Sequence, residues 1–345
     1  MKKFSLLAIL VLFLGVLTAC GGEKTQTATA KDEKYVLKAA IPYSSASLQT
    51  KYVEWFNEEL KKRSDGRLSL DIYPEAQLMP ANQEIPGILA GQIDLTHTSS
   101  GVATSFEPSY YLFDLPFLFD FDAKDPSVYA MAKRDYLNSE NGGKKITSKM
   151  EEKGLKVLAH TTADDHSAVF MADPNSLVTN IDSLKGKKLR VTGGTIVPET
   201  LKAVGASGIT INGSELSTAL QQGVVDGLIT TPLYAYDSKL PVKTVTFLPL
   251  VQYTNPVVMS QSKFDSLPAD LQEILVETGK DLEEYSDQLV IERLQGITDK
   301  FKEEGFKVYY PTKDEMNEWR KATLPVWKDF AKTVDGGQEL LDALE

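Results

Sequence analysis

The sequence predicts an α/β protein built from two similar lobes. Segments with strand periodicity alternate with segments of helical periodicity from Tyr35 onward, and this alternation starts again after residue 155. A Gly-x-(Val/Ile)-Asp motif also occurs once in each half, ending at Asp94 and at Asp226. Alternating strands and helices favour a mostly parallel sheet covered by helices, here in two copies.

The first half supplies a regular series of elements. Tyr52, Phe56 and Leu60 recur at helical spacing, and Gly66 follows as a stop signal. The predicted elements are a strand over 35–41, a helix over 48–64, a strand over 67–73, a short helix over 82–91 and a strand over 93–99.

The second half repeats this order and then changes character. Its predicted elements are strands over 155–161, 187–192 and 225–231, with helices over 197–205 and 214–223 between the last two. Apolar residues near a 3.6 period then predict one helix over 268–305. An oligomerisation coil and a brace packed across both lobes are both possible, and the brace is favoured because no heptad is kept. A strand over 307–311 and two terminal helices follow.

The N-terminal segment predicts an exported, lipid-anchored protein. Residues 1–20 combine Lys2 and Lys3, an apolar run that is short for a membrane span, and the sequence Leu-Thr-Ala-Cys. This end resembles the bacterial lipobox, which makes Cys20 the expected lipidation site and palmitate an expected modification; an uncleaved anchor helix is the alternative. Residues 21–34 are polar and predict a flexible tether.

The charge balance excludes some partners. Without Lys2 and Lys3 the chain has 35 basic against 48 acidic residues. A strongly acidic protein is a poor partner for nucleic acid or for an anionic membrane surface.

The sequence gives little support for an enzyme, a cofactor or a metal. P-loop, dinucleotide-binding GxGxxG, HExxH, GxSxG and CxxC motifs are all absent. The segment from His160 to His166 contains two aspartates, but no second ligand set accompanies it, so we expect no metal. His166 is the only weak candidate for acid–base chemistry.

Binding residues are easier to identify. Arg190 is one of six arginines and stands inside a strand pattern, with Leu189 and Val191 on the opposite face. A guanidinium near a cleft offers a two-pronged donor for a carboxylate; a surface charge or internal salt bridge is the alternative. Hydroxyls at predicted strand ends also suit a polar ligand, because ligands of open parallel sheets bind beyond the carboxyl ends of the strands. These hydroxyl residues are Thr98, Ser99, Ser100, Thr230 and Thr231.

Aromatic residues fall into two classes. The dense stripe at 107–122 predicts core packing rather than a ligand cage. Tyr43, Tyr234 and Tyr236 follow predicted strands and are better candidates for contact with a ligand. Asp94 and Asp226 predict structural roles, as turn or cap residues that accept backbone N–H groups.

Together these segments resemble the solute-binding subunits of tripartite ATP-independent periplasmic (TRAP) transporters, of the dicarboxylate-binding-protein type. The resemblance covers nearly the whole chain after the tether. It rests on GRLSLDIYPEAQL (66–78), LAGQIDL (89–95), LPFLF (115–119), IDSLKGKKLRV (181–191), LKAVGAS (201–207), SELSTALQQGVVDG (214–227) and FDSLPADLQEIL (264–275).

The resemblance implies a type II-like periplasmic-binding-protein fold with a ligand cleft between lobes and a long C-terminal brace helix. The expected lobes are 35–160 plus 256–296 and 161–255 plus 297–345. It implies a receptor, expected to be monomeric, that closes on a small organic acid and delivers it to a membrane permease driven by an ion gradient. A receptor for an ATP-driven importer or a sensor kinase, or an exported enzyme on the same fold, are the alternatives.

The family's ligand-clamping arginine corresponds to Arg190. Two positions depart from the family pattern. A second arginine common in the family is replaced by His166 or Ser167, and the acidic-amide form after Asp226-Gly227 is replaced by LITT, which places Thr230 near the family's pocket asparagine. Both departures argue against a simple sialic acid or dicarboxylate ligand and against metal-assisted binding.

Overall fold

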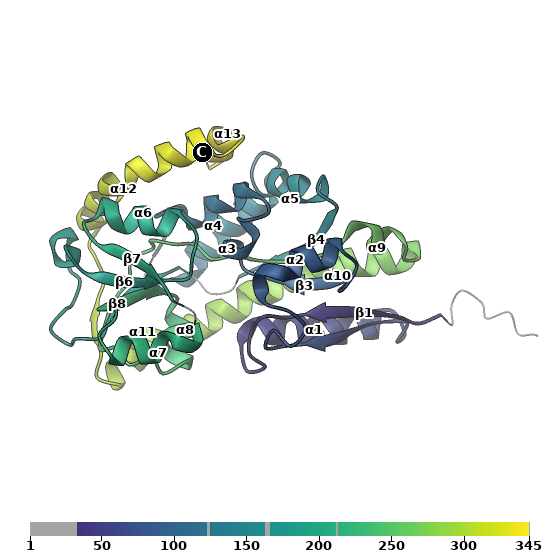
Figure 1. The fold of residues 1–345 in the computed structure, drawn as a ribbon, viewed down its shortest axis with the longest axis horizontal. Coiled ribbons are helices and arrows are strands. Elements are labelled where there is room, and N and C mark those ends of the chain that lie inside the picture. The colour runs from purple at the N-terminus through teal and green to yellow at the C-terminus, as the bar shows by residue number, and fades with distance from the viewer. Residues whose placement is uncertain (1–32, 123–124, 163–165, 212, 345) are drawn as a thin grey trace, which may run out of the picture. The chain divides into compact units, whose positions relative to one another are not determined.

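A five-stranded sheet confirms the predicted strands of the first half. The computed structural model describes residues 33–122, 125–162, 166–211 and 213–344. The strands lie in the order β2, β1, β3, β10, β4, and β1, β3 and β4 are labelled in Figure 1. Their bounds are β1 Tyr35–Ala40, β2 Leu68–Tyr73, β3 Leu95–His97, β4 Leu155–Thr161 and β10 Asn255–Ser260. β1 pairs in parallel with β2 and β3, whereas β10 runs antiparallel to β3 and β4.

A six-stranded sheet contains the predicted strands over 187–192, 225–231 and 307–311, whereas the predicted strand over 155–161 is β4 of the first sheet. Its order is β11, β9, β5, β8, β6, β7. The bounds are β5 Ala168–Met171, β6 Lys188–Val191, β7 Ser207–Thr210, β8 Gly227–Thr230, β9 Thr244–Thr246 and β11 Lys307–Tyr309. β6 pairs in parallel with β7 and β8, and β5 runs antiparallel to β8 and β9.

The chain passes from the first sheet to the second between β4 and β5 and returns between β9 and β10, and the strands β5 and β10 were not predicted from the sequence. β5 follows β4 of the first sheet but belongs to the second, and β10 follows β9 of the second sheet but belongs to the first. Each sheet therefore has one reversed strand among otherwise parallel strands, in agreement with the expectation of a mostly parallel sheet. β5 is buried at every position and β10 at all but the last, so neither shows the alternation that reveals a half-buried strand.

Helices cover the first sheet at the expected positions. α1 begins after Ser47, whose side chain accepts the N–H of Thr50, and buries Tyr52, Phe56 and Leu60 in the core. The elements of this region are α1 Leu48–Arg63, α2 Ala81–Leu89, α3 Ser100–Ala103, η1 Pro108–Asp114, α4 Pro126–Asn138, α5 Gly143–Glu151 and α9 Gln261–Asp265. The aromatic stripe is core, as predicted, with Tyr110, Phe113 and Phe119 buried in one apolar cluster.

Helices also surround the second sheet. The elements here are η2 Ile181–Leu184, α6 Ile196–Ala203, α7 Gly213–Gln221 and α8 Pro232–Asp237. Leu189 and Val191 of β6 lie in the apolar cluster on one face of this sheet together with Leu201 of α6, while Arg190 does not belong to that cluster. Leu228, the register partner of Arg190, lies in another apolar cluster, so the predicted alternation of β6 is present.

The predicted brace exists, but it is two helices rather than one. α10 spans Ala269–Leu294 and α11 spans Ile297–Glu303. Gly296 lies between them with φ of 74°, a left-handed conformation that ends a helix. α10 contacts β4 of the first sheet and α8 of the second, and a Cβ built on Gly279 would lie 2.1 Å from the Leu158 carbonyl oxygen. The glycine therefore allows the brace to lie directly on β4.

The two terminal helices are also present. α12 spans Lys313–Thr333 and α13 spans Gly337–Asp342. Trp319 of α12 packs in the cluster of the second sheet, whereas Phe330 and Leu340 pack with residues of α2 and η1. Residues 34–345 form one compact unit, and the lobe boundaries given above remain a prediction. The end of the chain contacts elements of the first region rather than only the second.

Candidate ligand-binding site

Arg190 is a buried cation near the carboxyl end of β6. Only 5% of the residue is exposed. Its Nε donates to the Ile211 carbonyl oxygen at 2.9 Å, which fixes the orientation of the guanidinium. Burial lowers the pKa of Arg190, and the nearby phenols of Tyr253 and Tyr234 partly offset this effect. Arginine nevertheless stays charged in proteins, so the site holds a buried positive charge.

That charge lacks a carboxylate partner inside the described part of the chain. The other buried or half-buried arginines have one: Arg134 pairs with Glu283 and Asp287, and Arg67 pairs with Asp270. No ion pair of Arg190 exists among the residues that the structure describes. Because an unpaired buried charge is costly, this position is suited to an anionic ligand.

Two tyrosines accompany Arg190. Tyr234 in α8 was predicted; it is 40% exposed, and its hydroxyl would lie 3.2 Å from a Cβ built on Gly213. Tyr253 was not predicted. Burial raises the pKa of Tyr253 to about 12, while Arg190 lowers it and Asp114 raises it, so this phenol lies near both charges. The side chain of Thr192 also lies near its hydroxyl. Tyr253 was missed because it lies outside any regular element.

Thr230 and Thr231 are buried at the end of β8. Arg190 is registered opposite Leu228 in the neighbouring parallel strand. Side chains two residues apart in a strand point to the same face of the sheet. Thr230 is two residues after Leu228, so it lies on the same face as Arg190 and closer to the carboxyl end of its strand. Thr231 is the N-cap residue of α8, and its side chain makes no capping hydrogen bond. Neither hydroxyl is used by a hydrogen bond among the described residues, and their contact with a ligand stays a prediction.

A second polar group lies in the first sheet region. Tyr43 follows β1, its hydroxyl accepts a hydrogen bond from Asn255 Nδ2 at 2.5 Å, and the side chain of Ser99 lies near it. Burial raises the pKa of Tyr43, and the nearby Glu84 carboxyl adds to the rise. The predicted Tyr43 and Ser99 are therefore brought together. Asn255 was missed, because it begins the unpredicted strand β10.

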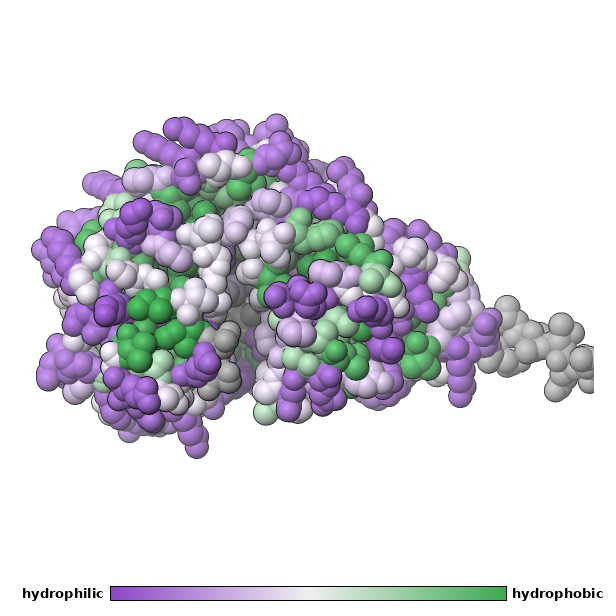
Figure 2. All heavy atoms as spheres, viewed as in Figure 1, coloured by the Kyte–Doolittle hydropathy of each residue, from purple (hydrophilic) through white to green (hydrophobic). Residues whose placement is uncertain are grey.

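The two groups come from opposite sides of a hollow. Figure 2 shows the surface recessed between the region of α8 and the region of α1. Tyr234 lies in α8, and Tyr43 stands just before α1. One crossing segment, 252–255, supplies Tyr253 to the first group and Asn255 to the second.

His166 lies in an aromatic environment. Its ring centroid is 3.9 Å from that of Phe121 and 5.8 Å from that of Phe247, and the residue is buried. It also forms an isolated antiparallel bridge with Gln252, one residue before Tyr253. The structure thus places it beside the crossing segment, within aromatic packing. Its contact with a ligand stays a prediction.

The other two histidines have structural partners. His97 Nδ1 lies 3.1 Å from the Gln49 carbonyl oxygen and Nε2 lies 2.8 Å from Thr161 Oγ1, and burial lowers its pKa to about 4. His160 Nε2 lies 2.8 Å from the Tyr110 hydroxyl. Burial, with Arg134 and Lys133 nearby, lowers the pKa of His160 to about 3.

The described residues contain no group of three His, Cys, Asp or Glu side chains that is arranged to hold a metal ion. Asp164 and Asp165 of the segment considered for a metal lie outside the described residues. A search of the described helices finds none with the length and apolar character needed to cross a membrane. The predicted signal segment and Cys20 also lie outside the described residues.

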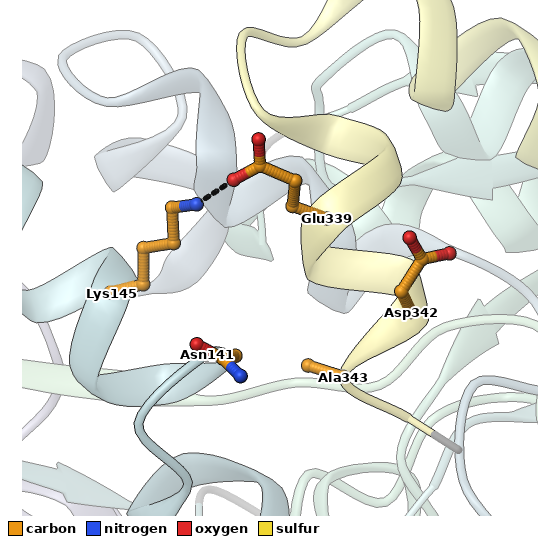
Figure 3. A pocket seen from close by; sticks show the side chains of 5 residues that line it. All are labelled: Asn141, Lys145, Glu339, Asp342 and Ala343. Atoms are coloured by element: carbon orange, nitrogen blue, oxygen red, sulfur yellow. Dashed lines mark hydrogen bonds and ion pairs between the residues drawn. The ribbon is translucent and has the colours of Figure 1, made fainter.

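Two open surface hollows are separate from these groups. One, of about 340 Å³, lies between α5 and α13, where Lys145 pairs with Glu339 beside Asn141 and Asp342 (Figure 3). The other, of about 570 Å³, lies between α6 and α12. Neither contains a residue of the groups around Arg190 and Tyr43.

The chain matches the DctP family model, described as bacterial extracellular solute-binding protein, family 7, over residues 40–333. It is 29% identical over 294 residues to the 2,3-diketo-L-gulonate-binding periplasmic protein YiaO of Escherichia coli (strain K12), covering 84% of this chain and 85% of that protein. It is 25% identical over 300 residues to the C4-dicarboxylate-binding periplasmic protein DctP of Rhodobacter capsulatus, covering 84% of each.

Solved structures share the fold. A TRAP periplasmic solute-binding protein from Desulfovibrio desulfuricans, with bound sn-glycerol-3-phosphate, matches with a TM-score of 0.81 at 20% identity, covering 90% of this chain and 96% of that one. A second, from Desulfovibrio salexigens with bound orotic acid, matches with a TM-score of 0.79 at 23% identity, covering 90% and 97%. At this identity the likeness concerns the fold, which is the two-lobed α/β fold that the sequence predicted.

Proposed function

Because the chain belongs to family 7 of the bacterial extracellular solute-binding proteins, we propose that it captures a small organic acid and that Arg190 binds the carboxylate. The single observation that carries this proposal is the buried Arg190 guanidinium, oriented by Ile211 and without a carboxylate partner among the described residues. A bidentate carboxylate satisfies such a group in both charge and geometry.

The relatives support an acidic ligand. The names of two of them specify 2,3-diketo-L-gulonate and C4-dicarboxylates, which are carboxylates. Thr230, Thr231, Tyr234, Tyr43 and Ser99 are the proposed polar contacts around the bound acid, and His166 is a further candidate. We propose no cofactor and no bound metal.

The proposed mechanism is closure around the ligand. The chain passes between the two sheets after β4 and again after β9, and the α10–α11 brace contacts both regions. A ligand that contacts residues of both sheets favours the closed arrangement by its differential affinity for that state. The protein then delivers the acid to the membrane permease of a TRAP transporter.

Family membership implies an exported protein. We further propose that residues 1–20 are a lipoprotein signal peptide, that Cys20 is lipidated and that residues 21–34 tether the domain to the outer face of the cell membrane. A monomer suffices for this role. Mass spectrometry of the N-terminal peptide tests the anchor: an acylated Cys20 is expected, whereas a peptide that still contains Met1 contradicts it.

A thermal-shift panel tests the function. Organic acids, sugar acids and amino-acid derivatives are added at a range of concentrations, and product formation is followed in parallel. A receptor is stabilised by RT ln(1 + [L]/Kd) without turnover. Stabilisation by at least one acid, lost in Arg190→Gln and kept in the exposed control Arg320→Gln, supports the proposal. Turnover of a ligand, or stabilisation by neutral compounds alone, would contradict the proposed function.

A further inference from the structure

Asp114 is a buried carboxylate at the end of η1. Only 3% of the residue is exposed. It lies against the loop that follows β6, since a Cβ built on Gly194 would stand 3.3 Å from Asp114 Oδ2. Gly194 has φ of 77°, a backbone conformation that residues with a side chain rarely adopt. A side chain here would also have to approach the Asp114 carboxylate closely. The glycine therefore keeps the loop open beside the Asp114 carboxylate.

This carboxylate has no partner in the described part of the chain. Other buried acids do: Glu107 accepts from Ser109 and pairs with Lys153, and Glu283 pairs with Arg134. Asp114 makes neither a hydrogen bond nor an ion pair with any residue that the structure describes. Burial raises its pKa to about 7, as expected for a carboxyl group that no cation stabilises.

Asp114 and Arg190 both act electrostatically on the same phenol, that of Tyr253. The Tyr253 hydroxyl experiences the charge of both residues, in opposite directions. Yet Arg190 and Asp114 do not form an ion pair with each other among the described contacts. The site therefore presents one buried cation and one buried carboxylate, both near Tyr253 and both unpaired.

Such an arrangement is unfavourable without a ligand. A buried charge requires an opposite charge or hydrogen-bond donors to replace the water that it has lost. A simple carboxylic acid would satisfy Arg190 but would leave Asp114 unpaired and add a second negative charge near it. A donor group on the ligand would satisfy Asp114 as well.

We propose that Asp114 selects acids that carry a hydrogen-bond donor, a hydroxyl or an ammonium group, close to the carboxylate bound by Arg190. This inference deepens the proposed function and depends on it. Asp114 acts as a specificity-determining residue: it accepts the donor of the ligand, while Tyr253 lies near both charges. Plain saturated acids of the same length are discriminated against.

The test uses matched ligand sets and calorimetric titration of the purified protein. The sets are propionate, lactate and alanine; succinate, malate and aspartate; and hexanoate and gluconate. We expect the donor-bearing members to bind at least about tenfold tighter than the plain acid of their set. The hydroxyl and ammonium members distinguish the two kinds of donor. If no acid in any set binds, both the proposed function and this inference fail.

Two variants separate selectivity from folding. In Asp114→Ala the preference for donor-bearing acids should fall at least about tenfold, because donor-bearing acids lose their acceptor while the plain acid binds as tightly as before or more tightly. In Asp114→Asn the ammonium arm should lose more affinity than the hydroxyl arm, because the amide keeps an acceptor but not the charge. The melting temperature of Asp114→Asn should not fall, because Asp114 has no protein partner to lose.

Glu107→Gln is the control, since Glu107 is a buried acid in the same region that does have partners. It should lower the melting temperature and leave the ligand preference unchanged. Plain acids that bind as tightly as their donor-bearing counterparts would overturn the inference while leaving the proposed function intact. An unchanged preference in Asp114→Ala, or an equal loss for every acid, would overturn it too.

Discussion

Asp226 and Lys188 exchange two hydrogen bonds between neighbouring strands of the second sheet. The Asp226 backbone N–H donates to the Lys188 carbonyl oxygen at 2.8 Å, and the Lys188 backbone N–H donates to Asp226 Oδ2 at 2.7 Å. Asp94 and Lys38 make the same pair in the first sheet, at 2.9 Å and 2.8 Å. The repeated Gly-x-(Val/Ile)-Asp motif therefore bonds the start of one strand to the backbone of its parallel neighbour.

This arrangement predicts a loss of stability without a loss of binding. Asp226→Ala removes one charge-assisted hydrogen bond to an exposed backbone N–H, and we expect unfolding to become about 1 kcal/mol easier. Urea denaturation measures the change, and ligand titration measures the affinity. Asp182→Ala is the matched control, because Asp182 makes only an exposed pair with Lys185 and should cost less than about 0.5 kcal/mol. A variant with normal stability and weakened binding would show that Asp226 contacts the ligand instead.

Glu84 predicts a pH dependence of stability. It is fully buried, Thr96 Oγ1 donates to its Oε2 at 2.8 Å, and burial raises its pKa to about 8. The folded state then binds a proton that the unfolded state releases at its ordinary, lower pKa. Stability contributed by the protonated form is therefore lost as the pH rises toward about 8.

The substitution Glu84→Gln should remove this loss of stability at high pH, because glutamine does not ionise. The variant should be little changed near pH 5 and increasingly more stable than the wild type as the pH rises to 9, by an amount on the order of a few kcal/mol. Melting curves at several pH values measure the difference. A difference that is constant with pH, or that grows toward acid, contradicts the assignment.

The buried ion pairs of Arg134 predict a large loss of stability when this residue is replaced. Its guanidinium lies 3.0 Å from Glu283 and 2.8 Å from Asp287, and Nη2 donates to the His160 carbonyl oxygen at 3.0 Å. All three charged side chains are mostly buried, and they connect α4 to the brace α10. Arg134→Met leaves two unpaired buried carboxylates, so we expect a destabilisation of about 3 kcal/mol or more.

Neutralising the acids should restore part of that loss. In the triple variant Arg134→Met, Glu283→Gln, Asp287→Asn, urea denaturation should show a higher stability than in Arg134→Met alone. Arg63→Ala is the control, because Arg63 makes half-exposed pairs with Glu59 and Asp281 and should change stability little. A triple variant less stable than the single one would mean that the ion pairs are not the source of the cost.

The sequence was sufficient for the elements with clear periodicity. The helix from Leu48 and the strand containing Arg190 were predicted because one apolar face repeats along each of them. The crossing strands β5 and β10 were not predicted, since buried strands lack that repeat. The break of the brace at Gly296 was also missed, although a glycine at the end of a helical pattern is a stop signal.

The site was only partly predictable for a related reason. Arg190, Tyr43 and Tyr234 stand next to recognisable strands or helices, and the structure gives each of them polar or charged neighbours. Tyr253 and Asn255 belong to a crossing segment whose position depends on the pairing of β10 with β3 and β4. Asp114 looked like part of an aromatic core stripe, and its lack of a partner is visible only in three dimensions.

The central claim is that Arg190 is the receptor for the carboxylate of the ligand. The most direct test is calorimetric titration of the wild type and Arg190→Gln with the tightest-binding acid of the panel and with its primary amide. The wild type should bind the acid in a saturable manner. The amide, and the acid with Arg190→Gln, should each bind more weakly by about 2–5 kcal/mol, or roughly thirtyfold or more. Equal affinity of the wild type for acid and amide, or unchanged affinity in Arg190→Gln, would contradict the claim.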